Sequence, residues 1–197
     1  MTRHAHPAWK IVLCDGGATT AQEDGRRAVS APGLVIPPQH AHTCSTTTGY
    51  LAVFVDLWRT GPGRGERVRQ LDERSVRRLL DLADADGLRE ALDPLLGSPP
   101  ALDPRLAYVL ERLDRPSIMT LADDVGLSPS GLRGLVHGAV GIPLVRLRQW
   151  HRLRHAVAQL GTVSPAMAAN AGHFADQAHF TRLARRLLGR TPGSLRG

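Results

Sequence analysis

The sequence is poor in several residue types, and each shortage excludes a class of protein or of structure. Cysteine occurs twice, as Cys14 and Cys44, which is too few for a disulfide framework. Apolar runs all stay well short of about eighteen residues, so we expect no membrane span. The first ten residues lack the apolar core of a signal peptide, so we expect a cytoplasmic protein. Aromatic residues make up only 4% of the chain, so we expect cores of Leu, Val and Ala.

Lysine is scarce throughout, and acidic residues are scarce in the last part of the chain. Lysine occurs once, as Lys10, whereas arginine occurs 24 times. From Ile118 onward there are ten arginines and three acidic residues, and their difference of +7 equals the formal charge of the whole chain. Such a concentrated basic block is typical of a protein that binds a polyanion. Arginine can also pair with phosphate or guanine through two hydrogen bonds.

The basic block begins with one helix–turn–helix pattern. We expect Thr120 to cap a first helix, and Gly126 to supply the positive φ of a tight turn. Ser128 and Pro129 are typical of the cap and first position of a second helix. In this motif the second helix enters the major groove of DNA.

The pattern returns after a predicted connecting helix over residues 143–160. A short helix rich in alanine is followed by a turn near Gly172-His173, and another helix begins near Ala175 or Asp176. Gly189 is expected to end that helix. The last eighty residues therefore predict two helix–turn–helix units in tandem.

Four segments of this region match, in order and spacing, the pattern of a known family. They are Leu121-Ala122, Gly126-Leu127-Ser128-Pro129-Ser130, Gly141-Ile142-Pro143-Leu144, and residues 174–182 with the following Gly189 and Pro192. The region resembles the AraC/XylS-type transcription regulators. The resemblance implies two recognition helices, held apart by the connecting helix, that enter successive major grooves about 34 Å apart. It implies a regulator and no enzyme, with double-stranded DNA as partner and RNA polymerase as a further candidate partner.

The sequence departs from the family pattern in both units. The first recognition helix carries Gly131, Gly134 and Gly138, and each costs about 1 kcal/mol of helix stability relative to alanine. At Gly134, where relatives often have a long polar residue, no side chain can reach a base. In the second unit, Gly172-His173 precedes Phe174 where relatives usually have Gly-Phe. Either one residue is inserted there, or His173 adopts a positive φ.

Base reading is expected from exposed side chains of the two recognition helices. Arg133, Arg182 and Gln177 are the candidates for base edges, because Arg matches guanine and Gln matches adenine. We expect smaller contacts from Ser130, Ala178 and Thr181. Phosphate contacts, which position the protein without specifying sequence, are predicted for Arg146, Arg148, Arg152, Arg185, Arg186 and Arg190. For each arginine the alternative is a solvated charge on a helix.

The first sixty residues carry a different pattern, in which short apolar segments are divided by Gly and Pro. Trp9–Cys14, Leu34–Ile36 and Tyr50–Trp58 are predicted strands. Two further segments, Ala18–Gln22 and Arg26–Ser30, flank a predicted hairpin turn over residues 23–25. We therefore predict an α+β chain in three parts. A small cupin-like β-barrel or sandwich over 1–60 serves as a sensor, a helical connector covers 66–116, and the all-α tandem helix–turn–helix domain covers 117–197. In relatives, helices at the place of residues 66–96 often pair two subunits, so this segment is a candidate homodimer contact.

Histidines near the amino terminus suggest a metal site. His4 and His6 precede one predicted strand and His42 follows another, which resembles the two halves of a cupin metal motif. The resemblance implies these three as ligands of a divalent ion such as Zn, Fe, Ni or Cu. The carboxylate expected after the first histidine pair is absent, and Trp9 and Lys10 stand in that neighbourhood. Two alternatives stay open: polar histidines at a chain end and a strand edge, or a barrel that binds an organic effector.

Three functions are consistent with these patterns. The leading interpretation is a sequence-specific DNA-binding transcription regulator that reads two successive major grooves and is controlled by a small-molecule or metal effector in the first domain. The second is a metal-dependent cupin enzyme with an appended helical domain. The third is a non-specific DNA binder, which the glycines of the first recognition helix make conceivable.

Overall fold

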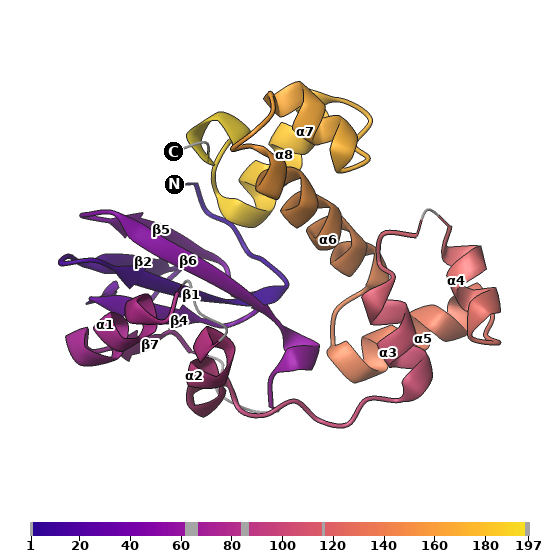
Figure 1. The fold of residues 1–197 in the computed structure, drawn as a ribbon, viewed down its shortest axis with the longest axis horizontal. Helices are drawn as coiled ribbons and strands as arrows, with labels where there is room; N and C mark the ends of the chain where they lie inside the picture. Colours follow the sequence, from indigo (N-terminus) through magenta and orange to yellow (C-terminus); the bar gives the residue numbers. More distant parts are fainter. Residues whose placement is uncertain (1, 62–66, 84–86, 116, 196–197) are drawn as a thin grey trace. The chain divides into compact units, whose positions relative to one another are not determined.

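The computed structural model describes residues 2–61, 67–83, 87–115 and 117–195, which form two compact units. The first unit is residues 1–100 and the second is residues 101–197. Figure 1 shows a β-rich first unit and a helical second unit. The predicted α+β class is therefore confirmed. In the described ranges, no helix has both the length and the apolar character needed to span a membrane.

Two antiparallel sheets form the first unit. One sheet has the strand order β6-β1-β4-β7 and the other has the order β3-β2-β5. The strands are β1 (Ala8–Cys14), β2 (Thr19–Glu23), β3 (Val29–Ala31), β4 (Gly33–Ile36), β5 (His42–Thr46), β6 (Tyr50–Asp56) and β7 (Arg69–Leu71). A short 3-10 turn, η1 (Leu57–Arg59), follows β6. The predicted small β-domain is present, and the β2–β3 hairpin encloses the predicted turn.

β1 is the central strand of the first unit, and all seven of its residues are buried. It pairs with β4 on one side and with β6 on the other, where Lys10 lies opposite Phe54. Two strands were not predicted from the sequence. β5 is polar and pairs with β2, so that His42 lies opposite Glu23, whereas β7 occupies a place where we predicted helix.

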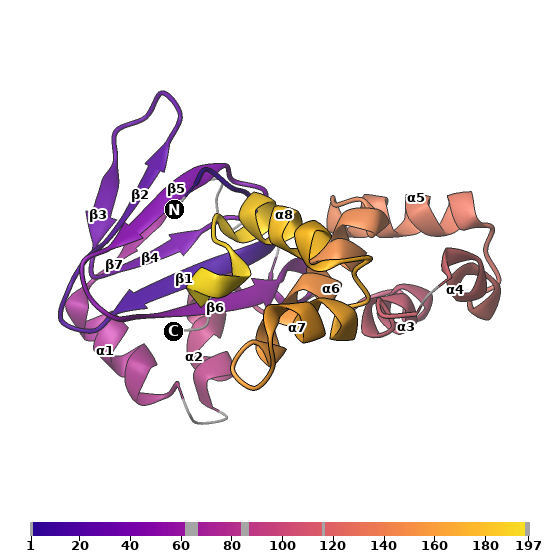
Figure 2. The same cartoon turned by 90° about the horizontal axis from the view of Figure 1, so that it is seen from above.

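Two helices of the predicted connector belong to the core of the first unit. They are α1 (Glu73–Asp81) and α2 (Gly87–Leu96), and Figures 1 and 2 show them beside the four-stranded sheet. Their buried leucines pack with Trp9, Ile11 and Leu13 of β1. Asp72 caps α1 by accepting a hydrogen bond from the Ser75 amide at 2.7 Å. The connector predicted over 66–116 is thus divided between the two units.

The second unit is helical. Its elements are α3 (Pro104–Glu111), α4 (Ile118–Asp124), α5 (Pro129–Val140), α6 (Leu144–Gln159), α7 (Pro165–Ala171), α8 (Gln177–Leu188) and a final 3-10 turn, η2 (Pro192–Leu195). α6 is the predicted connecting helix, and α5, α7 and α8 pack against it. Its buried side recurs at helical spacing through Leu144, Leu147, Trp150, Leu153 and Ala156. In Figure 2, α5 and α8 lie on one side of this unit and α4 and α7 on the other.

Candidate DNA-binding surface and histidine cluster

The first helix–turn–helix unit is formed by α4 and α5. The Ser117 hydroxyl caps α4 by accepting hydrogen bonds from the amides of Met119 and Thr120 at 3.1 and 3.3 Å. The predicted cap Thr120 is therefore wrong, because a better placed hydroxyl precedes it and Thr120 lies in the first turn. The predicted turn is confirmed by Gly126, with φ of 66°. Ser128 caps α5 as predicted, accepting from the Gly131 amide at 3.1 Å.

The second helix–turn–helix unit, formed by α7 and α8, is capped in the same way. Ser164 caps α7 by accepting from the Met167 amide, and Asp176 caps α8 by accepting from the His179 amide at 2.6 Å. His173 has φ of 55°, so the predicted positive φ is present in the turn. The turn also holds one residue more than the turn between α4 and α5. Gly189, with φ of 68°, ends α8.

The recognition-helix side chains predicted to read bases lie on the exposed sides of α5 and α8. On α5, Arg133 and Ser130 are exposed, and the Ser130 hydroxyl lies 3.0 Å from that of Ser128. The opposite side of α5 buries Leu132, Val136 and Val140. On α8, Gln177, Ala178 and Arg182 are exposed, and Thr181 is half-buried. The opposite side of α8 buries Phe180, Leu183, Ala184 and Leu187.

Two of the predicted phosphate contacts lie close together on α6 and α8. Arg186 donates a hydrogen bond from Nη2 to Oε1 of Gln149 at 2.8 Å, which fixes its guanidinium beside α6. Partial burial, and then the charge of Arg186, lower the pKa of Arg146. Two guanidinium groups held near each other repel, and an anion bound between them relieves that repulsion. Arg185 is exposed one position before Arg186.

Two further arginines that we predicted to contact phosphates, Arg148 and Arg152, form hydrogen bonds within the second compact unit. Arg148 donates to the backbone carbonyls of Leu113 (3.2 Å) and Arg115. Arg152 donates from Nε to the carbonyl of Gly172 at 3.0 Å and lies 4.9 Å over the ring of Phe174. Both guanidinium groups therefore tie neighbouring segments to α6, a role that the sequence pattern did not reveal.

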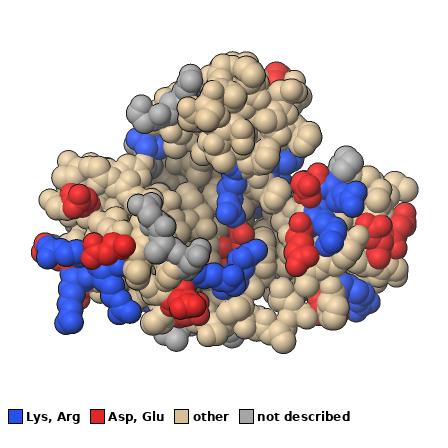
Figure 3. All heavy atoms as spheres, viewed as in Figure 1, with Lys and Arg blue, Asp and Glu red and all other residues tan. Residues whose placement is uncertain are grey.

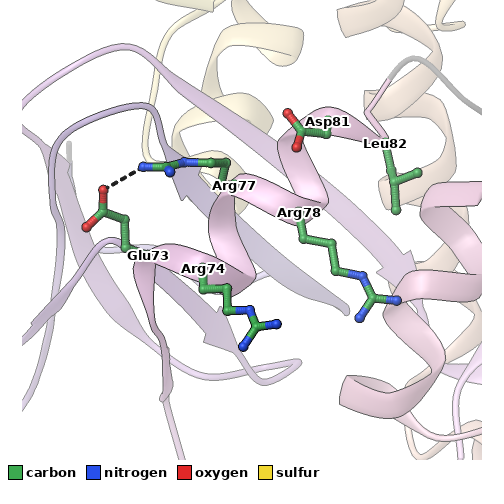
Figure 4. A pocket seen from close by; sticks show the side chains of 6 residues that line it. All are labelled: Glu73, Arg74, Arg77, Arg78, Asp81 and Leu82. Carbon is green, nitrogen blue, oxygen red and sulfur yellow. Dashed lines mark hydrogen bonds and ion pairs between the residues drawn. The ribbon is translucent and has the colours of Figure 1, made fainter.

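The surface charge is mixed outside these helices. Acidic and basic side chains are interspersed on the face shown in Figure 3, so the basic residues of that face form no single patch among the described residues. Figure 4 shows an open hollow along α1. Its lining residues are Glu73, Arg74, Arg77, Arg78, Asp81 and Leu82.

The hollow along α1 has few features of a binding site. Glu73 and Arg77 form an ion pair at 3.0 Å, and both side chains are about three-quarters exposed. Exposed pairs contribute only about 0–1 kcal/mol. Its three arginines stand between Glu73 and Asp81, so both signs of charge are present, and we interpret this surface as a solvated helix face.

The three predicted metal ligands come together in the first unit. His4, His6 and His42 are buried, with one ring nitrogen of each lying within 4.8 Å of the others. Burial lowers the pKa of His4 to about 4 and that of His42 to about 3, and it holds the pKa of His6 well below 6.5. All three rings are therefore neutral at pH 7.

Lys10 lies beside this cluster and was not predicted from the sequence to be part of it. It is 3% exposed, and its charge contributes to lowering the pKa values of all three histidines. A signal for it is present in the sequence, because the only lysine of the chain stands within the apolar run Trp9–Cys14. Buried lysines are rare unless they have a partner or a function.

Two similarly capped helix pairs on one connecting helix define a tandem helix–turn–helix DNA-binding domain. Residues 121–197 match the helix-turn-helix domain family in its AraC-type form. The second compact unit therefore carries a DNA-binding domain of the AraC type over these residues. Curated proteins include no match to this sequence.

Solved structures share the fold of the whole chain. An alanine variant of ToxT from Vibrio cholerae, without ligand, has a TM-score of 0.61 at 9% identity and is matched over 98% of this chain and 90% of that one. ToxT with bound unsaturated fatty acid has a TM-score of 0.59 at 10% identity, over 98% and 88% of the two chains. A probable AraC family transcriptional regulator from Rhodopseudomonas palustris is 24% identical over 47% of this chain and 90% of that one, with a TM-score of 0.42.

Proposed function

We propose that this regulator is sequence-specific and reads two successive major grooves of DNA through α5 and α8. The observation that carries the proposal is that both recognition helices leave their predicted base-reading side exposed while their opposite sides are buried. Both helices contact α6. A rigid helix that both contact sets the spacing between the two recognition helices, and recognition of two half-sites requires a fixed spacing.

The proposed roles follow from side-chain chemistry. Arg133 and Arg182 contact guanine, and Gln177 contacts adenine, through two hydrogen bonds each. Ser130, Ala178 and Thr181 are small enough for single hydrogen bonds or contacts with a thymine methyl group. Arg146, Arg185 and Arg186 bind phosphates, and the Gln149 hydrogen bond orients Arg186 for that contact.

Selection of bound sequences from random duplex DNA tests this function. We expect two short preferred motifs whose centres are about 10–10.5 base pairs apart, one helical turn of DNA. Preference at one position of the first motif should be lost in Arg133→Ala, and at one position of the second in Arg182→Ala. An even distribution of selected sequences would contradict the proposal and favour the non-specific binder.

We further propose that the first unit binds an effector that controls DNA binding. ToxT has been solved with an unsaturated fatty acid and with a naphthyl-butenoic acid, so a chain of similar fold binds small carboxylic acids. The sheets of the first unit enclose His6, Lys10 and His42 at 3% exposure or less, and these groups are suited to a metal ion or an anion. An operator affinity that stays constant with every metal and fatty acid tested would contradict this role.

The homodimer and the contact with RNA polymerase remain predictions. For the homodimer, the outer face of α1 is charged and exposed, whereas the centres of stable interfaces are depleted of charge. Sedimentation at micromolar concentration gives the oligomeric state directly, and a monomer there would count against pairing through residues 66–96.

A further inference from the structure

Three histidines meet inside the first unit although they come from separate parts of the chain. His4 and His6 precede β1, and His42 begins β5. Their ring centroids lie 4.3 to 6.0 Å apart. One nitrogen of each ring lies within 4.8 Å of the other two, and all three residues are at most 3% exposed.

The hydrogen bonds of the rings fix which nitrogen faces the others. Nδ1 of His4 bonds to the carbonyl of Thr2 at 2.9 Å, Nδ1 of His6 to that of Ala8 at 2.7 Å, and Nδ1 of His42 to that of His40 at 2.9 Å. A carbonyl oxygen only accepts, so each Nδ1 must carry the hydrogen. In a neutral ring, Nε2 then keeps its lone pair. A backbone carbonyl on the second nitrogen is the arrangement that orients histidines bound to metals.

The backbone around the rings is also fixed. His4 and His42 exchange two hydrogen bonds of 3.0 Å, and the Gln39 amide donates to the carbonyl of His6 at 2.7 Å. Gln39 has φ of 57°, a costly conformation for a residue other than glycine. Such strain persists where the surrounding structure requires it and is frequent at functional sites. The turn at Gln39 thus holds His42 against the segment of His4 and His6.

Packing alone explains this arrangement poorly. Nε2 of His4 and Nε2 of His42 are buried without a hydrogen-bond partner in the described chain. Burying such an acceptor costs about 1–3 kcal/mol when nothing compensates it. A cation that accepts the lone pairs removes this cost and explains why the three rings converge.

We propose that His4, His6 and His42 bind one divalent transition-metal ion of the zinc class through their Nε2 atoms. The site deepens the effector part of the proposed function by naming the ligand class. Three imidazoles, with no thiolate or carboxylate in the cluster of described residues, suit zinc and its neighbours better than magnesium or calcium. A tetrahedral ion with bonds of about 2.0–2.1 Å holds its nitrogens roughly 3.4 Å apart, so the rings move inward slightly on binding.

Three protein ligands leave a fourth position, and Lys10 determines what occupies it. Lys10 is buried in β1 opposite Phe54, whose ring lies 5.3 Å from that of His6, so Lys10 and the cluster lie on the same face of the sheet. A divalent cation beside Lys10 is repelled unless an anion also binds. The fourth ligand is therefore an anion such as hydroxide, chloride or a carboxylate.

Metal titration of the full chain, expressed without a histidine tag, tests the site. We expect one Zn²⁺ per chain by calorimetry, and the visible ligand-field bands of four-coordinate Co²⁺ on cobalt loading. His42→Ala should weaken zinc binding by more than the about 10–100-fold that loss of an outer-shell partner costs. His155→Ala is the matched control, because His155 is an exposed histidine of α6, in the second compact unit; its zinc affinity should equal that of the unmodified chain.

A second variant keeps the test valid if His42→Ala fails to fold. His4→Ala removes the ligand nearest the chain end, and circular dichroism checks its fold before titration. X-ray absorption of the zinc-loaded chain should show three imidazole nitrogens at about 2.0–2.1 Å. No binding, or weak binding at several sites that His4→Ala leaves unchanged, would overturn the site. Because every readout is bound metal, this outcome is independent of whether the chain binds DNA.

Discussion

The two compact units differ in where their polar side chains lie. In the described residues, every buried polar or charged side chain belongs to the first unit: His4, His6, Lys10, Thr19, Glu23, His42 and Thr60. The described residues of the second unit bury only apolar side chains, around Trp150 and Phe180, and the arginines among them lie at least partly exposed. Buried polar groups cost stability unless they are satisfied, and they are commonly kept for a function. The proposed effector site thus lies in the polar interior of the first unit, whereas the proposed DNA-reading residues lie on the surface of the second.

The response to acid should separate the two units most strongly. The folded-state pKa values of His4 and His42 are lowered to about 4 and about 3, so below pH 6.5 the unfolded chain binds more protons. Stability is therefore lost as the pH falls from about 6.5 towards these values, by about 1.4 kcal/mol per pH unit for each ring. For the metal-free chain we expect a loss of roughly 2 kcal/mol per ring at pH 5.

Amide hydrogen exchange, corrected for the intrinsic effect of pH, locates this loss. Protection should fall in β1 and β5 and should change little in α6. In His42→Gln, the stability lost at pH 5 should be smaller by the contribution of one histidine ring. Equal loss of protection in both units would contradict the assignment of acid sensitivity to the buried histidines.

Substitution of Arg182 tests the claim that the second unit acts through its surface. Arg182→Ala should weaken binding to the selected DNA by about 1–3 kcal/mol and relax preference at one base pair, without changing the unfolding free energy. Arg105→Ala is the matched control, since Arg105 of α3 is also an exposed arginine and pairs with Asp103. A gel-shift titration at constant salt measures both. Equal effects of the two variants would mean that Arg182 contributes charge alone.

A glycine in the second helix–turn–helix unit should be sensitive to a single added methyl group. A Cβ atom at Gly172 would lie 2.8 Å from Cβ of Ala156 and 2.9 Å from the carbonyl oxygen of Arg152. Gly172→Ala should therefore destabilise the second unit by about 1–3 kcal/mol, the usual cost of overpacking. Gly161→Ala is the control, because nothing lies within 4 Å of its added methyl group. Urea unfolding at pH 7 measures both, and an unchanged midpoint for Gly172→Ala would show that α7 and α6 separate easily.

Local sequence signals predicted most of the second unit. Ser128-Pro129 and Gly189 are cap and stop residues whose chemistry depends on a few neighbours, and each lies where predicted. The error at Thr120 has the same origin, because two hydroxyl residues three apart both fit a cap and only Ser117 is in place. The roles of Arg148 and Arg152 depend on carbonyls 20 to 35 residues away, which spacing along the chain cannot reveal.

The first unit was less predictable because its site depends on strand pairing. β5 has no apolar alternation that would predict a strand, and it forms because β2 pairs with it. The three histidines could be named from their spacing and a resemblance, but the carbonyls that orient their rings could not. The sequence shows Lys10 as a charged residue within an apolar strand, but its place beside the cluster depends on the register of the sheet.

The smallest effect concerns the glycines that distinguish α5 from α8. Both are twelve-residue helices, but α8 has no internal glycine, whereas α5 has exposed glycines at positions 131, 134 and 138. A methyl group added at Gly134 or Gly138 meets nothing within 4 Å, so each change to alanine should stabilise the chain by about 1 kcal/mol. Gly131→Ala should gain less, because its methyl group would lie 3.2 Å from the Ser128 hydroxyl that caps the helix.

The same two changes also show whether DNA binding requires glycine at positions 134 and 138 of α5. Thermal unfolding gives the gain in stability, and affinity for the selected DNA gives its functional cost. If DNA lies close against α5, Gly134→Ala weakens binding while Gly138→Ala, one helical turn further along, weakens it less. Unchanged affinity in both variants would mean that α5 contacts DNA only through Arg133. In that case α8 would lie closer to its major groove than α5 does.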